Sequence, residues 1–333
     1  MKQIPLLWIG IIGCSIISFI FIFGPHLPNI DTEVKETKYI LGKGGNLDFI
    51  LPPYPPSERF LLGSDSKGRD MYSALVLGTR TTIIEIGLIS LITFLLALPF
   101  GMLSAHIPFL KRLLEGWNYL FSRIPVFFYV IILTTIPFFI FSMQRPIWMI
   151  SLIIVLELGK TAEFVHKTVK EIQQTAYYDA AIVSGTRVFG LWRWYYVPGC
   201  FSQWLSYFIL HMGNMLFLLG QLGFFNIFVA QKLTQVGGIP GTNVTYYAIE
   251  NTSIAWPTFL ANTFNDMNNC PWVPIFTCIV ITFTIFSFIA LGKGLLQYSL
   301  LKQQGLLYRK ESFLTKTFLS FNPFYKKERE LSK

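Results

Sequence analysis

The chain has 333 residues, of which 53% are hydrophobic, 17% aromatic and only 14% charged, and its formal net charge is +9. Charged residues make up about a quarter of a soluble domain, so this composition argues against a soluble protein and predicts an integral membrane protein. The four cysteines and four histidines are scattered. No Cys-x-x-Cys or His-x-x-x-His spacing indicates a metal site or a disulfide framework.

Membrane spans are predicted from intervals without charged residues, since about 20 apolar residues cross the hydrocarbon core as a helix. The long intervals are 3–30, 86–111, 124–144, 194–231 and 267–292, and a sixth, 146–156, is short and ends at Glu157. The first interval is longer than the apolar region of a signal peptide and lacks a small-residue cleavage motif, so we expect an uncleaved first span.

The distribution of Lys and Arg predicts the orientation, because short cytoplasmic loops are enriched in these residues. Six spans with both termini inside place most basic residues in the cytoplasm, whereas omitting the short fourth span would place the five basic residues of 160–193 outside. The predicted fold is therefore all-α, with six transmembrane helices and cytoplasmic N and C termini.

This topology divides the chain into a first span, an external segment, a membrane domain that contains a cytoplasmic loop, and a basic cytoplasmic tail. The basic and aromatic tail is typical of a segment attracted to anionic lipid headgroups. The corresponding ranges are 1–23, 24–81, 82–296 with the loop at 161–198, and 297–333.

The external segment ends in the stretch "LLGSDSKGRDMYSALVLGTRTT", which predicts a capped turn leading into an interfacial helix. Ser64 or Asp65 could cap backbone N–H groups, while Arg69 and Asp70 could pair with each other or anchor at lipid headgroups.

Two carboxylates, Glu85 and Glu157, lie near the ends of predicted spans. An ionisable residue at membrane depth is a functional candidate, although both side chains could equally extend to the interface.

The cytoplasmic loop predicts two helices joined by a glycine. Apolar residues recur at steps of three and four from 161 to 184, as on one face of a helix. Gly185 is expected to end this helix in the left-handed conformation, and Thr186 to cap a second helix at 187–197. Such a loop could bind in a groove of a partner protein or lie on the bilayer surface.

The spacing of "DAAIVSG" and the following "YVP" resembles the EAA loop of ABC importer permeases. That pattern is Glu-Ala-Ala, three residues, Gly, nine residues, then Ile-x-Leu-Pro. The matching positions here are Asp179, Ala180, Ala181, Gly185, Tyr195, Val197 and Pro198, with Asp in place of Glu.

Two further stretches resemble the second permease subunit of oligopeptide, dipeptide and nickel importers. One resembles the Gly-Thr-Asp-x-x-Gly-Arg-Asp segment before the transport domain, matching at Gly63, Asp65, Gly68, Arg69, Asp70, Gly78 and Arg80. The other resembles the Pro-Trp stretch and the final Leu-Gly-Asp-Gly-Leu-Arg, matching at Pro271, Trp272, Leu291, Gly292, Gly294 and Leu295, whereas Lys293 and Leu296 depart from the pattern.

The resemblance implies a type I importer permease in a bacterial cytoplasmic membrane. Its expected partners are the bilayer, a second permease, two cytoplasmic ATPases and an external substrate-binding protein, and no nucleic acid. The chain has no Gly-x-x-x-x-Gly-Lys-Ser/Thr loop, so the resemblance assigns ATP and Mg to the ATPases and leaves this subunit non-catalytic and without a cofactor.

The resemblance also implies a role for each residue of the loop. Asp179 would pair with or cap groups on the ATPase, Ala180 and Ala181 would allow a close fit, Gly185 would set the elbow, and Pro198 would start the fifth span.

Several alternatives remain open. The solute could be a peptide, a nickel chelate or another small molecule, and a membrane sensor or assembly factor could keep this fold without transport. A membrane-embedded enzyme would need clustered His, Asp, Glu or Cys residues, which the sequence does not supply. The segment 226–271 is longer than the resemblance predicts. It could be an enlarged external lid or docking surface, or a plain insertion.

Overall fold

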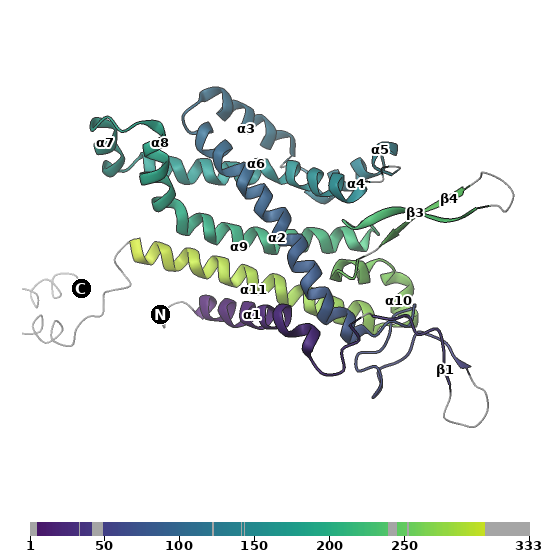
Figure 1. Ribbon diagram of the computed structural model, residues 1–333. Helices are drawn as coiled ribbons and strands as arrows, with labels where there is room; N and C mark the ends of the chain where they lie inside the picture. Colours follow the sequence, from purple (N-terminus) through teal and green to yellow (C-terminus); the bar gives the residue numbers. More distant parts are fainter. Residues whose placement is uncertain are drawn as a thin grey trace, which may run out of the picture.

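The computed structural model describes residues 5–32, 34–41, 49–121, 123–140, 142, 144–238, 245–251 and 253–303. Five long helices run along a common direction or cross it obliquely (Figure 1). They are α1 (Pro5–Phe23), α2 (Met71–Ser104), α6 (Arg145–Gln173), α9 (Val197–Phe224) and α11 (Trp272–Gln303). Within the described residues, the chain is a helical bundle as predicted.

Four stretches of the described chain are long and apolar enough to cross a membrane. A fifth arises if α3 (Pro108–Phe121) and α4 (Val126–Thr134), which meet at a bend of 78°, count as one span. The four are Pro5–His26, Met71–Ser104, Val188–Phe224 and Trp272–Leu301. The helical membrane protein predicted from composition is therefore confirmed at four or five candidate spans.

Small residues allow the outer helices to pack closely. Gly10 of α1 lies against the backbone of Leu291 in α11, and Gly294 of α11 lies against Leu7, so a Cβ atom at either glycine would overlap its neighbour. Close backbone approach at small residues is the usual means of helix association in membranes.

Two predicted helix boundaries are wrong. The interfacial helix expected after the turn at 63–70 and the span expected from residue 86 form one helix, α2, which begins at Met71, where Asp70 caps it. The helix expected over 161–184 is broken at Thr175, whose backbone is extended, so that α6 ends at Gln173 and α7 (Ala176–Val183) begins separately. The apolar period continues across the break because α7 packs back onto the same cluster as α6.

Two short antiparallel strand pairs, which were not predicted, lie outside the helical bundle. β1 (Ile40–Leu41) pairs with β2 (Phe49–Ile50), and β3 (Gln231–Gly238) pairs with β4 (Thr245–Asn251), with a register shift between Gln235 and Gly237. The β3–β4 pair projects past the helix ends (Figure 1). Within the segment 226–271, the described residues thus include this antiparallel strand pair, followed by the short helices η3 (Trp256–Leu260) and α10 (Thr263–Asn269).

The remaining short elements connect the helices. They are η1 (Gly24–His26), α5 (Pro137–Ile140), α8 (Val188–Leu191), the π-helical turn η2 (Trp192–Tyr196), η3 (Trp256–Leu260) and α10 (Thr263–Asn269). Residues 297–303 of the predicted tail continue α11, and 304–333 lie outside the described residues.

Candidate functional site

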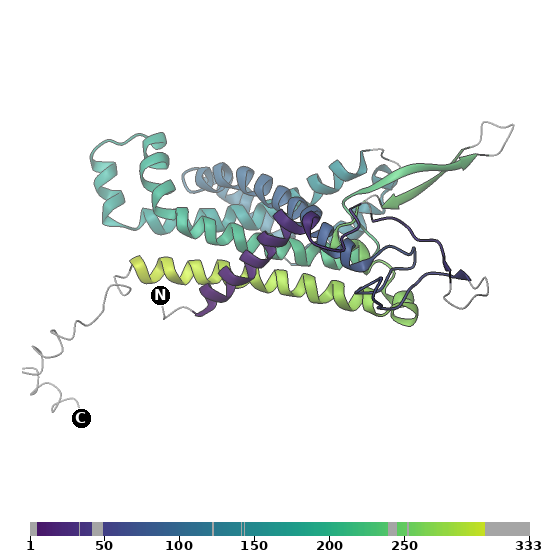
Figure 2. The same cartoon turned by 60° about the horizontal axis from the view of Figure 1, so that its bottom comes forward.

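The loop that resembles the EAA motif forms a helical hairpin at one end of the bundle. α7 and α8 lie beyond the ends of α6 and α9, at the end opposite to β1 and the β3–β4 pair (Figure 1). The beginning of α1 and the end of α11 lie at the same end as this hairpin (Figures 1 and 2).

Gly185 forms the predicted elbow. Its φ is +76°, in the left-handed region. The Gly185 N–H donates to the Ile182 carbonyl at 3.0 Å, and the Thr186 N–H donates to the Ala181 carbonyl at 3.1 Å. These are the two hydrogen bonds of a Schellman motif, which satisfy the last carbonyls of α7.

The two alanines of the motif differ in exposure, so only Ala180 lies on the surface of the hairpin. Ala180 and Asp179 are exposed, whereas Ala181 is only 1% exposed and packs in a cluster with Leu191 and Val165. A helix turn of 100° per residue separates adjacent side chains, so both cannot face a partner when one faces the bundle.

The second half of the hairpin also differs from the prediction. Arg187, not Thr186, is the N-cap residue of α8, and it makes no side-chain capping hydrogen bond. The helix then passes through the π-helical turn η2 into α9 without interruption, so the exposed Pro198 lies in the first turn of a continuing helix rather than at a break.

Exposed apolar side chains gather on the hairpin. α7 lies outside the candidate membrane spans and α8 lies at the start of the candidate span Val188–Phe224, so such residues indicate a contact with another protein or with lipid. They are Tyr177, Ile182, Val183, Val188, Phe189 and Trp194.

The hairpin is tied to the long helices through Tyr196. Its hydroxyl lies 2.9 Å from Gln173 Nε2, which donates to it, and 3.0 Å from His106 Nε2 beyond the end of α2. Burial and the positive charge of Lys170 hold the pKa of His106 below its ordinary value. A displacement of the hairpin would therefore act on α2, α6 and α9 together.

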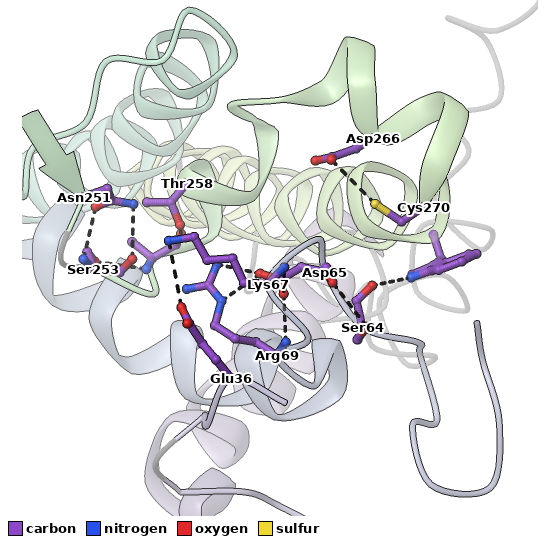
Figure 3. Close-up of polar contacts among 12 residues, drawn as sticks. Glu36, Ser64, Asp65, Lys67, Arg69, Asn251, Ser253, Thr258, Asp266 and Cys270 are labelled. Carbon is purple, nitrogen blue, oxygen red and sulfur yellow. Dashed lines mark hydrogen bonds and ion pairs between the residues drawn. The ribbon is translucent and has the colours of Figure 1, made fainter. Parts of the chain in front are cut away.

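The second motif, residues 63–70, forms a compact turn at the opposite end of the bundle. Asp65 Oδ1 accepts hydrogen bonds from the Lys67 and Arg69 N–H groups at 3.0 and 2.8 Å. Its Oδ2 pairs with Arg69 Nε and Nη2 at 2.7 and 2.6 Å (Figure 3). Asp70 caps α2 by accepting from the Ser73 N–H at 2.9 Å. Arg69 thus pairs with Asp65 and not with Asp70.

Both motif glycines at positive φ are required by close neighbours. A Cβ at Gly63 would lie 2.5 Å from Trp272 Nε1, and a Cβ at Gly68 would overlap the Thr37 carbonyl. Trp272 Nε1 donates to the Ser64 carbonyl at 2.8 Å. The motif therefore joins the external segment to the first turn of α11. The carboxylates of Asp65 and Asp70 bind groups of the motif itself and of the first turn of α2.

A polar cavity of about 510 Å³ lies beside this turn. The turn contributes Asp65, Lys67 and Arg69 to its lining, and the segment before α11 contributes Asn262 and Asp266. Burial raises the pKa of Asp266. This cavity and its charged wall were not predicted, because the residues come from segments far apart in the sequence.

The two candidate carboxylates lie inside helices rather than at their ends. Glu85 is in α2 and accepts a hydrogen bond from Ser253 Oγ at 3.4 Å. Glu157 is in α6 and pairs with Lys160 at 3.6 Å.

No family model matches the chain, but it is similar to a curated transport protein. The glutathione transport system permease protein GsiD of Pectobacterium atrosepticum is 22% identical over 244 residues, which is 72% of this chain and 72% of that protein. This match confirms the resemblance to ABC importer permeases. Together with the apolar helices, it makes the chain a multi-pass inner-membrane protein of the permease kind.

Proposed function

We propose that this chain is the membrane-spanning subunit of an ATP-driven importer and that the α7–α8 hairpin binds a cytoplasmic ATPase. The exposed apolar side chains of the hairpin carry this proposal, because they lie on a helical segment that matches the EAA spacing. The Tyr196 hydrogen bonds give a route by which movement of the hairpin reaches α2, α6 and α9.

In the proposed topology, α1, α2, the bent α3–α4 pair, α6, α9 and α11 are the six spans. α6 has 29 residues and is therefore about 44 Å long, which is enough to cross the bilayer. The hairpin and both termini are cytoplasmic in this arrangement. The excess of Lys and Arg in 160–193 and after residue 293 supports that side.

In this proposal, a second permease completes the pathway, two ATPases supply the energy, and an external binding protein delivers the solute. The solute is a peptide or a related small molecule, which is consistent with a relative named for glutathione transport. The β3–β4 hairpin and the polar cavity beside residues 63–70 then lie on the external side. ATP binding must favour one conformation of the bundle over the other for this coupling to work.

The hairpin assignment is tested by Phe189→Glu in the complex expressed with its own partners. Phe189 is 71% exposed, so the substitution leaves the fold intact but places a charge in the proposed contact. We expect ATPase co-purification to fall by at least about tenfold, as for an interface hot spot. Phe264→Glu is the matched control, because Phe264 is 77% exposed on α10 at the other end.

Unchanged ATPase recovery with Phe189→Glu, or an equal loss with Phe264→Glu, would count against the hairpin as the ATPase contact.

A further inference from the structure

α6 carries an ion pair in the middle of the bundle. Lys160 Nζ lies 3.6 Å from Glu157 Oε1, and the side chains are 38% and 12% exposed. Glu157 is thus buried and Lys160 half-buried, and the pair lies away from the ends of α6, which continues for more than a turn in both directions.

The packing of α6 against α9 fixes the depth of this pair. The rings of Phe164 and Tyr207 stack with centroids 4.0 Å apart. The two helices run in opposite directions, so one turn from this contact, away from the hairpin, Lys160 on α6 lies level with His211 on α9. His211 is close to the midpoint of Val197–Phe224.

Contacts through glycines connect this level to the outermost span. Gly213 lies next to this level on α9, and a Cβ atom placed there would be 3.2 Å from Phe288 Cβ of α11. Gly13 of α1 packs against the adjacent Ser287 of α11. Gly13 is in the middle of Pro5–Phe23. The Glu157–Lys160 pair therefore lies near the centre of the proposed membrane region.

A second polar group at this level is incompletely paired. His211 is 2% exposed, and its Nδ1 lies 3.0 Å from Ser90 Oγ of α2. Its Nε2 is buried with no hydrogen-bond partner among the described residues. Buried polar atoms normally have partners. His211 Nε2 therefore leaves one hydrogen-bonding position open at the level of the ion pair.

Charged side chains at the centre of a bilayer are costly and are kept where they face a water-filled path or a polar partner. The apolar neighbour Val155 is 44% exposed on another side of α6, as expected for a lipid-facing residue. The exposed part of Lys160 lies away from that side, because five residues turn a helix by about 140°.

We propose that Glu157 and Lys160 form a binding site, within the translocation pathway, for a small solute that carries both an ammonium and a carboxylate group. Lys160 binds the carboxylate and Glu157 binds the ammonium, so each residue exchanges its partner in the resting ion pair for a solute group of the same charge as that partner. His211 supports the site from behind as a positioning residue. This site rests on the proposed import function and adds to it the solute class and the residues that bind it.

The first test is access from water in the complex with its partner subunits. Lys160→Cys and Val155→Cys are made in a background that lacks Cys14 and Cys278, because these two are not fully buried. With a charged, membrane-impermeant thiol reagent, we expect Lys160→Cys to react at least about tenfold faster, since only the thiol in water ionises readily. Equal rates at the two positions in every nucleotide state would overturn the pathway site.

The second test is binding of radiolabelled dialanine to the purified complex. Lys160→Met and Glu157→Gln should each weaken binding by at least about tenfold, the loss typical of a charge-assisted contact. N-acetyl-dialanine amide, which lacks both charges, should not compete. The matched controls are Lys167→Met and Glu163→Gln, which change an exposed ion pair of 2.6 Å on the same helix and should leave binding unchanged.

No specific dialanine binding to the unsubstituted complex, or an equal loss with the Lys167 control, would overturn the assignment to a zwitterionic solute. Neither test requires ATP hydrolysis. A chain whose hairpin binds no ATPase would still show these results, so failure of this site and failure of the coupling proposal are distinguishable.

Discussion

Replacing Gly185 by alanine tests how the hairpin elbow is built. Gly185 has φ +76°, and a Cβ there would have no atom within 4 Å. Alanine therefore adds no clash, and its whole cost is that of a left-handed L-residue, about 1–2 kcal/mol. That cost corresponds to a shift of roughly five- to thirtyfold in the closed-to-open equilibrium of the hairpin.

Hydrogen–deuterium exchange of peptides from 176–191 measures this shift directly. We expect amide protection to fall by about tenfold in Gly185→Ala, because opening the elbow releases the two Schellman hydrogen bonds. Gly116→Ala in α3 is the matched control, since it also has open space at its Cβ but no positive φ. Alanine should be neutral or stabilising there, by up to about 1 kcal/mol.

The reasoning about Gly185 would be refuted if both variants kept the amide protection that the unsubstituted chain shows in 176–191. Equal losses in the two variants would refute it as well, because only one of the two glycines has a backbone that disfavours alanine.

Two further predictions concern single residues. Asp65→Asn should lower the free energy of unfolding, measured by thermal unfolding, by about 1–3 kcal/mol, because its pair with Arg69 weakens. Lys67→Gln, which removes an exposed pair of 4.0 Å with Glu36, should change the stability little. Similar losses in the two variants would contradict the structural role of Asp65. His106 has a pKa below its ordinary 6.5, from burial and Lys170, so the unfolded chain binds more protons and stability should fall as the pH drops below about 6.5. His106→Gln should reduce this slope, and an unchanged slope would contradict the assignment.

The sequence predicted those features that depend on local chemistry. Gly185 was expected at a left-handed elbow, and its φ of +76° confirms it. The low charge content predicted membrane helices, because a helix without charges such as α1 can only be stable in an apolar environment.

Features that depend on tertiary contacts were missed. Charge intervals placed the start of the second span at residue 86, but α2 also contains Arg80, which is exposed, and Glu85, which accepts a hydrogen bond from Ser253. The exposure of Ala180 and the burial of Ala181 depend on how α7 packs, which the spacing of the motif does not contain.

The β3–β4 hairpin had a signal in the sequence. The β-favouring run "TYYAI" follows the turn-forming "GGIPGTN", a pattern that indicates strands joined by a turn. The pairing of Glu157 with Lys160 at the level of His211 had no such signal. The i,i+3 spacing of the two residues allows the pair on any helix, but its level relative to His211 follows only from the antiparallel packing of α6 and α9.

Site-specific photo-crosslinking at Val183 tests the central claim most directly. Val183 is 89% exposed at the end of α7, beside the elbow. With a photoreactive residue at this position in the membrane-embedded complex, the account predicts a crosslink to the ATPase subunit. Crosslinks to lipid alone, with the ATPase present in the same membranes, would contradict it and would make the hairpin a surface-lying helix.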